Sequence, residues 1–224
     1  LCKPGMRGDI HVIPTNGGTG RQVTYHPGDD TLLNWTADGR LLFASDRESY
    51  RNRFHQLYLV GPKGGLPTKL PLNYAETADL AAAGHTLYFT IKPDFQEEAW
   101  KRYDGGRTPN IWRMDLRTLK ASRMAPAAWS QSDPMLDGDT VYFLSEAGTK
   151  HRDNIFAWKP GSTPRQVTHF TNLDIRFPSM SIGAGAISFN VGGRLEILDL
   201  KSGEVHPVKL DIRGENSRSA SKSE

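Results

Sequence analysis

Short runs that either alternate apolar and polar residues or are rich in aromatic residues dominate the chain, and helical periodicity is nearly absent. Typical runs are Leu41–Ser45, Leu87–Thr90 and Val141–Ser145, each rich in aromatic or branched side chains. Turn-forming pairs such as Asp38-Gly39 and Asp137-Gly138 separate the runs. Alternation over four to eight residues bounded by turn signals is typical of β-strands joined by hairpins. The pattern therefore predicts an all-β chain.

A short segment of the form polar–aliphatic–any–apolar repeats along the chain, with 40 to 54 residues between successive copies. An aromatic-rich strand precedes four of the copies, and most copies are followed by a turn and a further strand, such as Arg21–Thr24 or Arg165–Thr168. The copies are Asp9-Ile10-His11-Val12, Gln56-Leu57-Tyr58-Leu59, Asn110-Ile111-Trp112-Arg113, Asn154-Ile155-Phe156-Ala157 and Arg194-Leu195-Glu196-Ile197.

A further strand, containing Trp35, Leu80, Met135 or Met180, lies ahead of each aromatic-rich strand. Four strands per unit at this spacing are what a β-propeller blade requires. Each four-stranded sheet would be apolar on both faces, so one blade cannot hide its faces unless blades stack around an axis. We therefore predict an all-β fold, a β-propeller of four-stranded antiparallel blades. The alternative is a β-sandwich in which the spacing is coincidental.

The repeats give about four and a half blades, because residues 1–8 leave no room for two strands before Ile10. Such a set would expose an apolar face and unpaired sheet edges. We therefore expect further blades upstream in a longer parent chain. The predicted organisation is an atypical N-terminal segment (1–8), a partial propeller domain (9–214) and a disordered serine-rich tail (215–224), with a half blade at 9–25 and whole blades at about 31–71, 76–125, 131–168 and 175–209.

Composition narrows the class of protein further. The 224 residues are 37% hydrophobic and 24% charged, as in ordered globular proteins, and no apolar run approaches the length of a membrane-spanning helix. Lys and Arg total 28 against 25 Asp and Glu, and the basic residues are scattered. This distribution argues against nucleic-acid and membrane partners. The single cysteine, Cys2, excludes a disulfide framework and a cysteine-based zinc site.

Standard catalytic signatures are missing from the chain. There is no Gly-x-Ser-x-Gly elbow and no His-Glu-x-x-His, and the seven histidines fall in different repeats. The adjacent carboxylates Asp29-Asp30 and Glu97-Glu98 are interpreted as solvated loop charges, since neighbouring residues of a strand face opposite sides. We therefore expect no catalytic residue, metal site or cofactor in this chain.

Two insertions, at residues 47–54 and 93–108, interrupt the blade pattern and concentrate positive charge. Loops between propeller strands project to a rim, where binding usually resides. Guanidinium groups pair well with carboxylates, so a peptide C-terminus or an acidic partner would suit them. Alternatively, these cations pair with acidic residues of the same loops and hold the loops in place. The candidate peptide-binding residues are Arg51, Arg53, Trp100, Lys101, Arg102, Tyr103 and Arg107.

The second insertion also carries a resemblance to a known family. The segment Trp100-Lys101-Arg102-Tyr103-Asp104-Gly105-Gly106, followed by Asn110-Ile111-Trp112, resembles the N-terminal six-bladed, TolB-like propeller of the tricorn proteases (peptidase family S41). The resemblance extends from about Gly8 to Gly214. Supporting matches are Ala44-Ser45-Asp46-Arg47-Glu48-Ser49, Gly64-Gly65-Leu66-Pro67 and Gly192-Gly193-Arg194-Leu195.

The resemblance implies that about four and a half of six blades are present here, in a module that gates or channels peptides in a large, multidomain serine peptidase. The single cysteine and the lack of a leader predict the cytoplasm, with the periplasm as the alternative. In that family the catalytic serine and histidine lie far downstream, and no position of this chain matches them. The implied partners are peptides, the remaining domains of the parent chain and further copies of the parent in a homo-oligomer. Two alternatives remain: a non-catalytic TolB-like scaffold that binds proteins, for example in a periplasmic assembly, and the propeller of another hydrolase.

Overall fold

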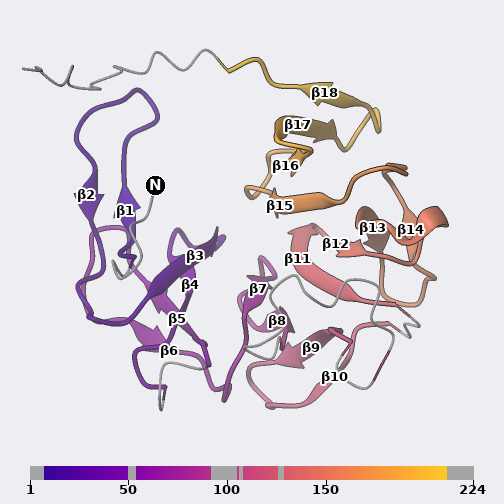
Figure 1. Ribbon diagram of the computed structural model, residues 1–224. Coiled ribbons are helices and arrows are strands. Elements are labelled where there is room, and N and C mark those ends of the chain that lie inside the picture. Colours follow the sequence, from indigo (N-terminus) through magenta and orange to yellow (C-terminus); the bar gives the residue numbers. More distant parts are fainter. Residues whose placement is uncertain (1–7, 50–53, 92–104, 106–107, 126–128, 211–224) are drawn as a thin grey trace, which may run out of the picture.

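The computed structural model describes residues 8–49, 54–91, 105, 108–125 and 129–210. These residues form four four-stranded antiparallel sheets and one two-stranded sheet, arranged one after another around a common centre (Figure 1). The predicted β-propeller architecture is confirmed.

Each four-stranded sheet is a meander whose first strand lies nearest the centre (Figure 1). The first sheet contains β3 (Asp30–Trp35), β4 (Leu41–Ser45), β5 (Gln56–Val60) and β6 (Thr68–Lys69); the second contains β7 (Thr77–Leu80), β8 (Thr86–Thr90), β9 (Ile111–Asp115) and β10 (Ala121–Arg123). The third contains β11 (Gln131–Asp137), β12 (Thr140–Ser145), β13 (Asn154–Trp158) and β14 (Arg165–Gln166); the fourth contains β15 (Ile175–Ser179), β16 (Ala186–Val191), β17 (Arg194–Asp199) and β18 (Val205–Pro207). A short 3-10 helix, η2 (Thr149–His151), lies between β12 and β13.

The two-stranded sheet corresponds to the outer half of a blade. Its strands are β1 (His11–Val12) and β2 (Arg21–Gln22), which pair antiparallel. Ile10 and Val23, at its edge, are buried against β4 and β5 of the first full sheet. The sheet therefore occupies the place of the third and fourth strands of a blade, as the repeat spacing predicted.

Strand β4 shows why the sheets stack. Successive side chains of a strand point to opposite faces of the sheet. Leu41 and Phe43 face the two-stranded sheet, whereas Leu42 and Ala44 face the second full sheet. Because all four are buried, both faces of this blade are covered, and burying each large side chain contributes about 1.5–3 kcal/mol.

The later interfaces between sheets repeat this arrangement. Aromatic and aliphatic side chains from the facing strands of two neighbouring sheets share one buried cluster at each interface. The cluster between the second and third sheets includes Tyr88, Ile111, Phe143 and Phe156, and the cluster between the third and fourth includes Leu144, Ile155, Ile187 and Phe189.

The outward face of the fourth sheet differs from the apolar face that the sequence predicted. Cross-strand partners share one face of a sheet, and Ser188 pairs with Ile197 while Asn190 pairs with Leu195. The face is therefore mixed, and its two aliphatic side chains are half-buried. Figure 1 shows a space between this sheet and β1–β2. The expected apolar flank is mixed on this blade, because polar residues alternate with the buried ones along β16.

A repeated Arg-Gln-Val-Thr segment fastens the last strand of two blades to the third strand. The backbone N–H of Ile155 donates to the Thr168 hydroxyl at 2.9 Å, and the N–H of Ile10 donates to the Thr24 hydroxyl at 3.0 Å. Both threonines are buried. The two Arg-Gln-Val-Thr segments therefore make the same contact in two blades: a threonine hydroxyl accepts a hydrogen bond from a buried backbone N–H.

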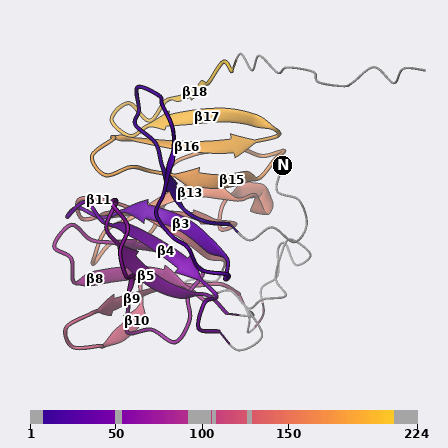
Figure 2. The ribbon, with the colours of Figure 1, turned by 90° about the vertical axis from the view of Figure 1, so that its left-hand side faces the viewer.

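The two rims of the propeller are built differently. Tight turns join the first strand of each full sheet to the second, and positive φ angles at Gly39 (78°) and Gly84 (75°) allow two of them. Longer connections join the second strand to the third in the first three sheets, so these connections leave from the opposite rim. The insertions at 47–54 and 93–108 both belong to this second set. Figure 2 gives a side view of the stacked sheets.

Candidate functional site: the central channel

The seven cationic and aromatic residues proposed from the sequence as a peptide-binding site lie outside the described residues. These are Arg51, Arg53, Trp100, Lys101, Arg102, Tyr103 and Arg107. Their role in peptide binding stays a prediction. One acid of the first insertion is described: Glu48 accepts a 2.7 Å hydrogen bond from Lys69 of β6 and forms an ion pair with it.

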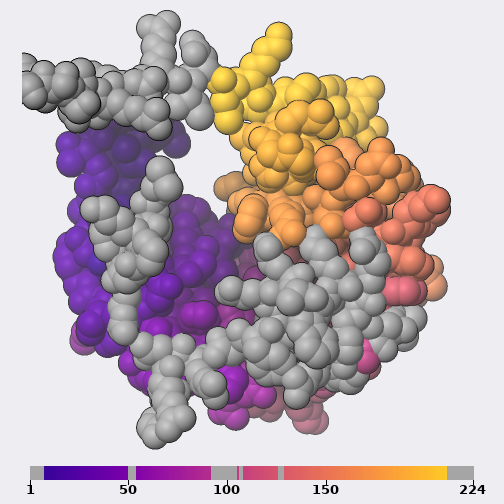
Figure 3. All heavy atoms as spheres, in the orientation of Figure 1, coloured from indigo at the N-terminus to yellow at the C-terminus, as the bar shows by residue number. Residues whose placement is uncertain are grey.

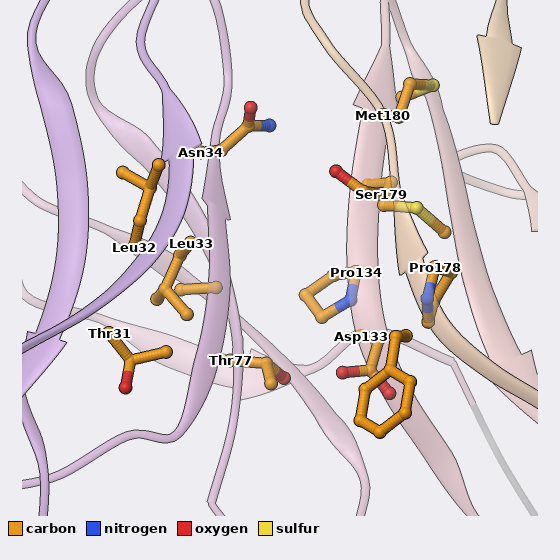
Figure 4. Close-up of a pocket in the computed structure, with 13 residues that line it drawn as sticks. Thr31, Leu32, Leu33, Asn34, Thr77, Asp133, Pro134, Pro178, Ser179 and Met180 are labelled. Carbon is orange, nitrogen blue, oxygen red and sulfur yellow. The ribbon is translucent and has the colours of Figure 1, made fainter. Parts of the chain in front are cut away.

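A pocket of about 240 Å³ lies at the centre of the arc, between the innermost strands of the four full sheets (Figure 4). We call it the channel pocket. In the space-filling view an opening passes between the indigo and purple N-terminal sheets and the orange C-terminal sheet (Figure 3). The pocket is lined by 31–34 of β3, Thr77 and Ala78 of β7, 133–135 of β11, and 177–180 at the end of β15.

The lining of the channel pocket is mainly apolar, with scattered hydroxyl and amide groups. Leu32 and Leu33 form one wall, opposite Pro178 and Ser179 (Figure 4). The thirteen lining residues include no Lys, Arg or His, and their single acid, Asp133, accepts a 2.6 Å hydrogen bond from the Ser132 hydroxyl. Such a lining suits an uncharged chain that offers apolar side chains and amide groups.

Three of the four innermost strands carry a bulge, and the bulges of β11 and β15 match each other. Between Ser132 and Met135, β11 has one residue more than the paired segment of β12. Between Arg176 and Ser179, β15 likewise has one residue more than the paired segment of β16. Asp133 in the first bulge and Phe177 in the second have a positive φ, and each precedes a proline. Proline cannot donate to the sheet ladder and is accommodated at bulges. These bulges turn the local backbone away from regular pairing where it borders the channel pocket.

The positive φ angles at the bulges carry a conformational cost. They are 53° at Asp133 and 51° at Phe177. The left-handed region costs an ordinary L-residue about 1–2 kcal/mol, and Asp and Asn tolerate it best. Strain of this kind at a pocket wall points to a functional surface.

A buried carboxylate next to the pocket joins three neighbouring blades. Asp79 of β7 is 3% exposed and accepts a 2.8 Å hydrogen bond from the backbone N–H of Leu136 in β11. It also accepts from the N–H of Leu80, and the Asn34 side chain of β3 hydrogen-bonds to it. Desolvation by burial nevertheless raises the pKa of Asp79 to about 6. Asp79 therefore fixes the positions of the innermost strands relative to one another.

The raised pKa of Asp79 makes stability depend on pH. Between about pH 4 and pH 6 the unfolded chain loses this proton while the folded chain keeps it, so the free energy of unfolding falls as the pH rises. Asp79→Asn removes the titration. We expect the free energy of unfolding of the variant, minus that of the parent, to rise by up to about 3 kcal/mol from pH 4 to pH 7 and to stay constant above pH 7. Urea denaturation across this range measures the difference; a difference independent of pH would contradict the assignment.

The interpretation of Asp29-Asp30 as solvated loop charges is wrong for Asp30. The guanidinium Nη2 of Arg47 lies 2.8 Å from both carboxylate oxygens of Asp30. The Asp30 side chain has no exposed surface and that of Arg47 is 10% exposed. Arg47 also lies 5.0 Å from the ring centre of Phe43 and 4.9 Å from that of Tyr58. Pairing across the sheet brings Arg47 over this carboxylate, which a local pattern cannot show.

Metal and membrane sites receive no support from the part of the chain that the structure covers. Among the described residues, no three His, Cys, Asp or Glu side chains are grouped so as to hold a metal ion. In the same part of the chain, no helix is long and apolar enough to cross a membrane. The channel pocket, lined by the innermost strands of all four full sheets, is the candidate functional site.

Four-stranded meanders stacked around a central channel define a β-propeller protein. Within that class, the family model described as the tricorn protease N-terminal beta propeller domain matches residues 3–204. The chain belongs to this family. The resemblance identified from the Trp-Lys-Arg-Tyr insertion is thereby confirmed.

Individual relatives agree with this assignment. The chain is 30% identical over 217 residues to a tricorn protease homologue of Streptomyces coelicolor and 23% identical over 210 residues to one of Saccharolobus solfataricus. Each alignment covers 92% of this chain and 18% of the relative, so the chain spans less than a fifth of their length.

Two solved structures share the fold. The crystal structure of the tricorn protease superposes with a TM-score of 0.75 at 20% identity, over 92% of this chain and 20% of that chain. TolB from Acinetobacter baumannii superposes with a TM-score of 0.63 at 18% identity, over 89% of this chain and 48% of that chain.

Proposed function

We propose that this chain is the peptide-channelling part of a tricorn-type serine peptidase, and that peptides pass through the channel pocket on their way to or from catalytic residues elsewhere in a longer chain. Family membership and the names of the relatives support the peptidase context. The observation that carries the proposal is that the innermost strands of all four full sheets line one pocket. Its partners would be peptides and the remaining domains of the parent chain.

The lining of the channel pocket fits the passage of peptides better than their hydrolysis. A hydrolytic site needs an activated nucleophile within hydrogen-bond reach of a base. The channel pocket has hydroxyls at Thr31, Thr77 and Ser179, and none of its described lining residues is a histidine or a lysine. Neutral hydroxyls can exchange hydrogen bonds with peptide amides without holding the peptide by charge.

Hydrolysis by this chain alone is therefore not expected. Purified 224-residue chain incubated with fluorogenic peptides should show turnover at the buffer rate. Turnover above that rate, abolished by a serine-directed inhibitor, would place catalytic residues in this chain and contradict the proposal.

Cysteine protection tests occupancy of the channel. In a Cys2→Ser background, Ser179→Cys places a thiol in the channel pocket and Ser122→Cys places one on the exposed outer strand β10. We expect a blocked apolar hexapeptide to slow alkylation of the first thiol several-fold and to leave the second unchanged. Equal rates for the first thiol with and without peptide would contradict the proposal.

A further inference from the structure

Phe177 is the most unusual residue of the channel pocket. Its side chain is 80% exposed and its backbone has φ = 51°. An aromatic side chain is ordinarily placed so that it buries surface, and a bulky residue at positive φ is a genuine outlier. The following residue, Pro178, restricts the backbone of Phe177 further. The ring therefore gains little from folding, while the backbone beneath it is strained.

The equivalent position of the neighbouring blade shows what the fold itself requires. Asp133 occupies the same place in the bulge of β11, also precedes a proline and has φ = 53°. Aspartate is a residue type that tolerates this conformation, and its side chain accepts a hydrogen bond from Ser132. Both matching bulges have a positive φ at this position, and only one of them has a phenylalanine there, so the bulge geometry does not depend on a phenyl ring.

We infer that Phe177 is the specificity-determining residue of the channel, whose ring contacts apolar side chains of peptides in the channel pocket. This inference rests on the proposed function and names its substrate class: uncharged peptides with aliphatic or aromatic side chains. Leu32, 44% exposed, and Leu33 line the opposite wall and supply the second apolar surface. No lining side chain is basic, so an acidic peptide would find no counter-charge there.

Phe177→Asn separates a binding role from a structural one. Asparagine tolerates positive φ, so the variant should lose strain and its melting temperature should rise by a few degrees. Leu66→Asn is the matched control, because Leu66 is 96% exposed in the connection between β5 and β6 and does not line the channel pocket. A fall in the melting temperature of Phe177→Asn by several degrees would show that the ring supports the fold, and would overturn the inference.

Calorimetric titration with two blocked hexapeptides, one rich in Leu and Phe and one of Ser and Gln, measures the preference. The parent chain should bind the apolar peptide more tightly. Phe177→Asn should weaken that binding about tenfold, with binding of the polar peptide unchanged and Leu66→Asn like the parent.

The outcomes distinguish this inference from the proposed function. If the apolar peptide protects Ser179→Cys and binds parent and Phe177→Asn equally, Phe177 does not set specificity although the channel binds peptides. If neither peptide binds the parent chain or protects that thiol, the channelling function fails, and the role of Phe177 fails with it.

Discussion

Replacement of Arg47 by alanine is expected to destabilise the fold by about 3–5 kcal/mol, because it leaves the fully buried carboxylate of Asp30 without its charged partner. The substitution also removes a guanidinium that lies over the rings of Phe43 and Tyr58. The pair joins the start of β3 to the residues after β4. Chemical denaturation of parent and variant measures the loss.

An exposed ion pair of the same chemistry is the control. Arg40 and Asp38 lie 2.7 Å apart with side chains 40% and 55% exposed, so Arg40→Ala should cost at most about 1 kcal/mol. The double variant Asp30→Asn with Arg47→Met should recover much of the loss, because no unpaired charge is left buried. Losses of similar size for Arg47→Ala and Arg40→Ala would contradict the burial of the Asp30–Arg47 pair.

Phe143→Ala is the second substitution with a large expected effect, a loss of about 3–5 kcal/mol. Phe143 is 1% exposed and belongs to the cluster that joins the second and third sheets. Truncation would open a cavity between two blades and remove the contact with Phe156, whose ring centre lies 5.9 Å away. Thermal and urea unfolding both measure the loss.

The matched control for this substitution is an apolar residue on the surface. Leu66 is 96% exposed, so Leu66→Ala should change stability by less than about 0.5 kcal/mol. A loss below about 1 kcal/mol for Phe143→Ala would mean that the blades do not depend on stacking for their stability.

The blades were predictable because their signals are local. The aromatic-rich apolar runs of β4, β8 and β12 and the turns after β3 and β11 are readable within a few residues, and the repeat spacing adds the order of the strands. The half blade at Ile10 followed from the same count. The mixed outward face of the fourth sheet was not predictable from this count, because burial along β16 depends on which neighbour covers each face of the sheet.

The channel pocket was not predictable from motifs. Its lining comes from four strands that are far apart in sequence and meet only when the blades stack. No lining residue belongs to a chemical signature, and the hydrogen bond from Leu136 to Asp79 joins residues 57 positions apart. One local signal was available: Pro134 and Pro178, which lie within β11 and β15, mark the bulges of those two strands.

Peptides are proposed to occupy the channel between the innermost strands, and photo-crosslinking would detect this occupancy directly. A blocked apolar hexapeptide carrying a benzophenone side chain would be irradiated with the 224-residue chain, and the adducts mapped by mass spectrometry. We expect adducts on β3, β7, β11 and the end of β15, and we expect unlabelled peptide to suppress them. Adducts confined to the outer strands β6, β10, β14 and β18 would contradict it.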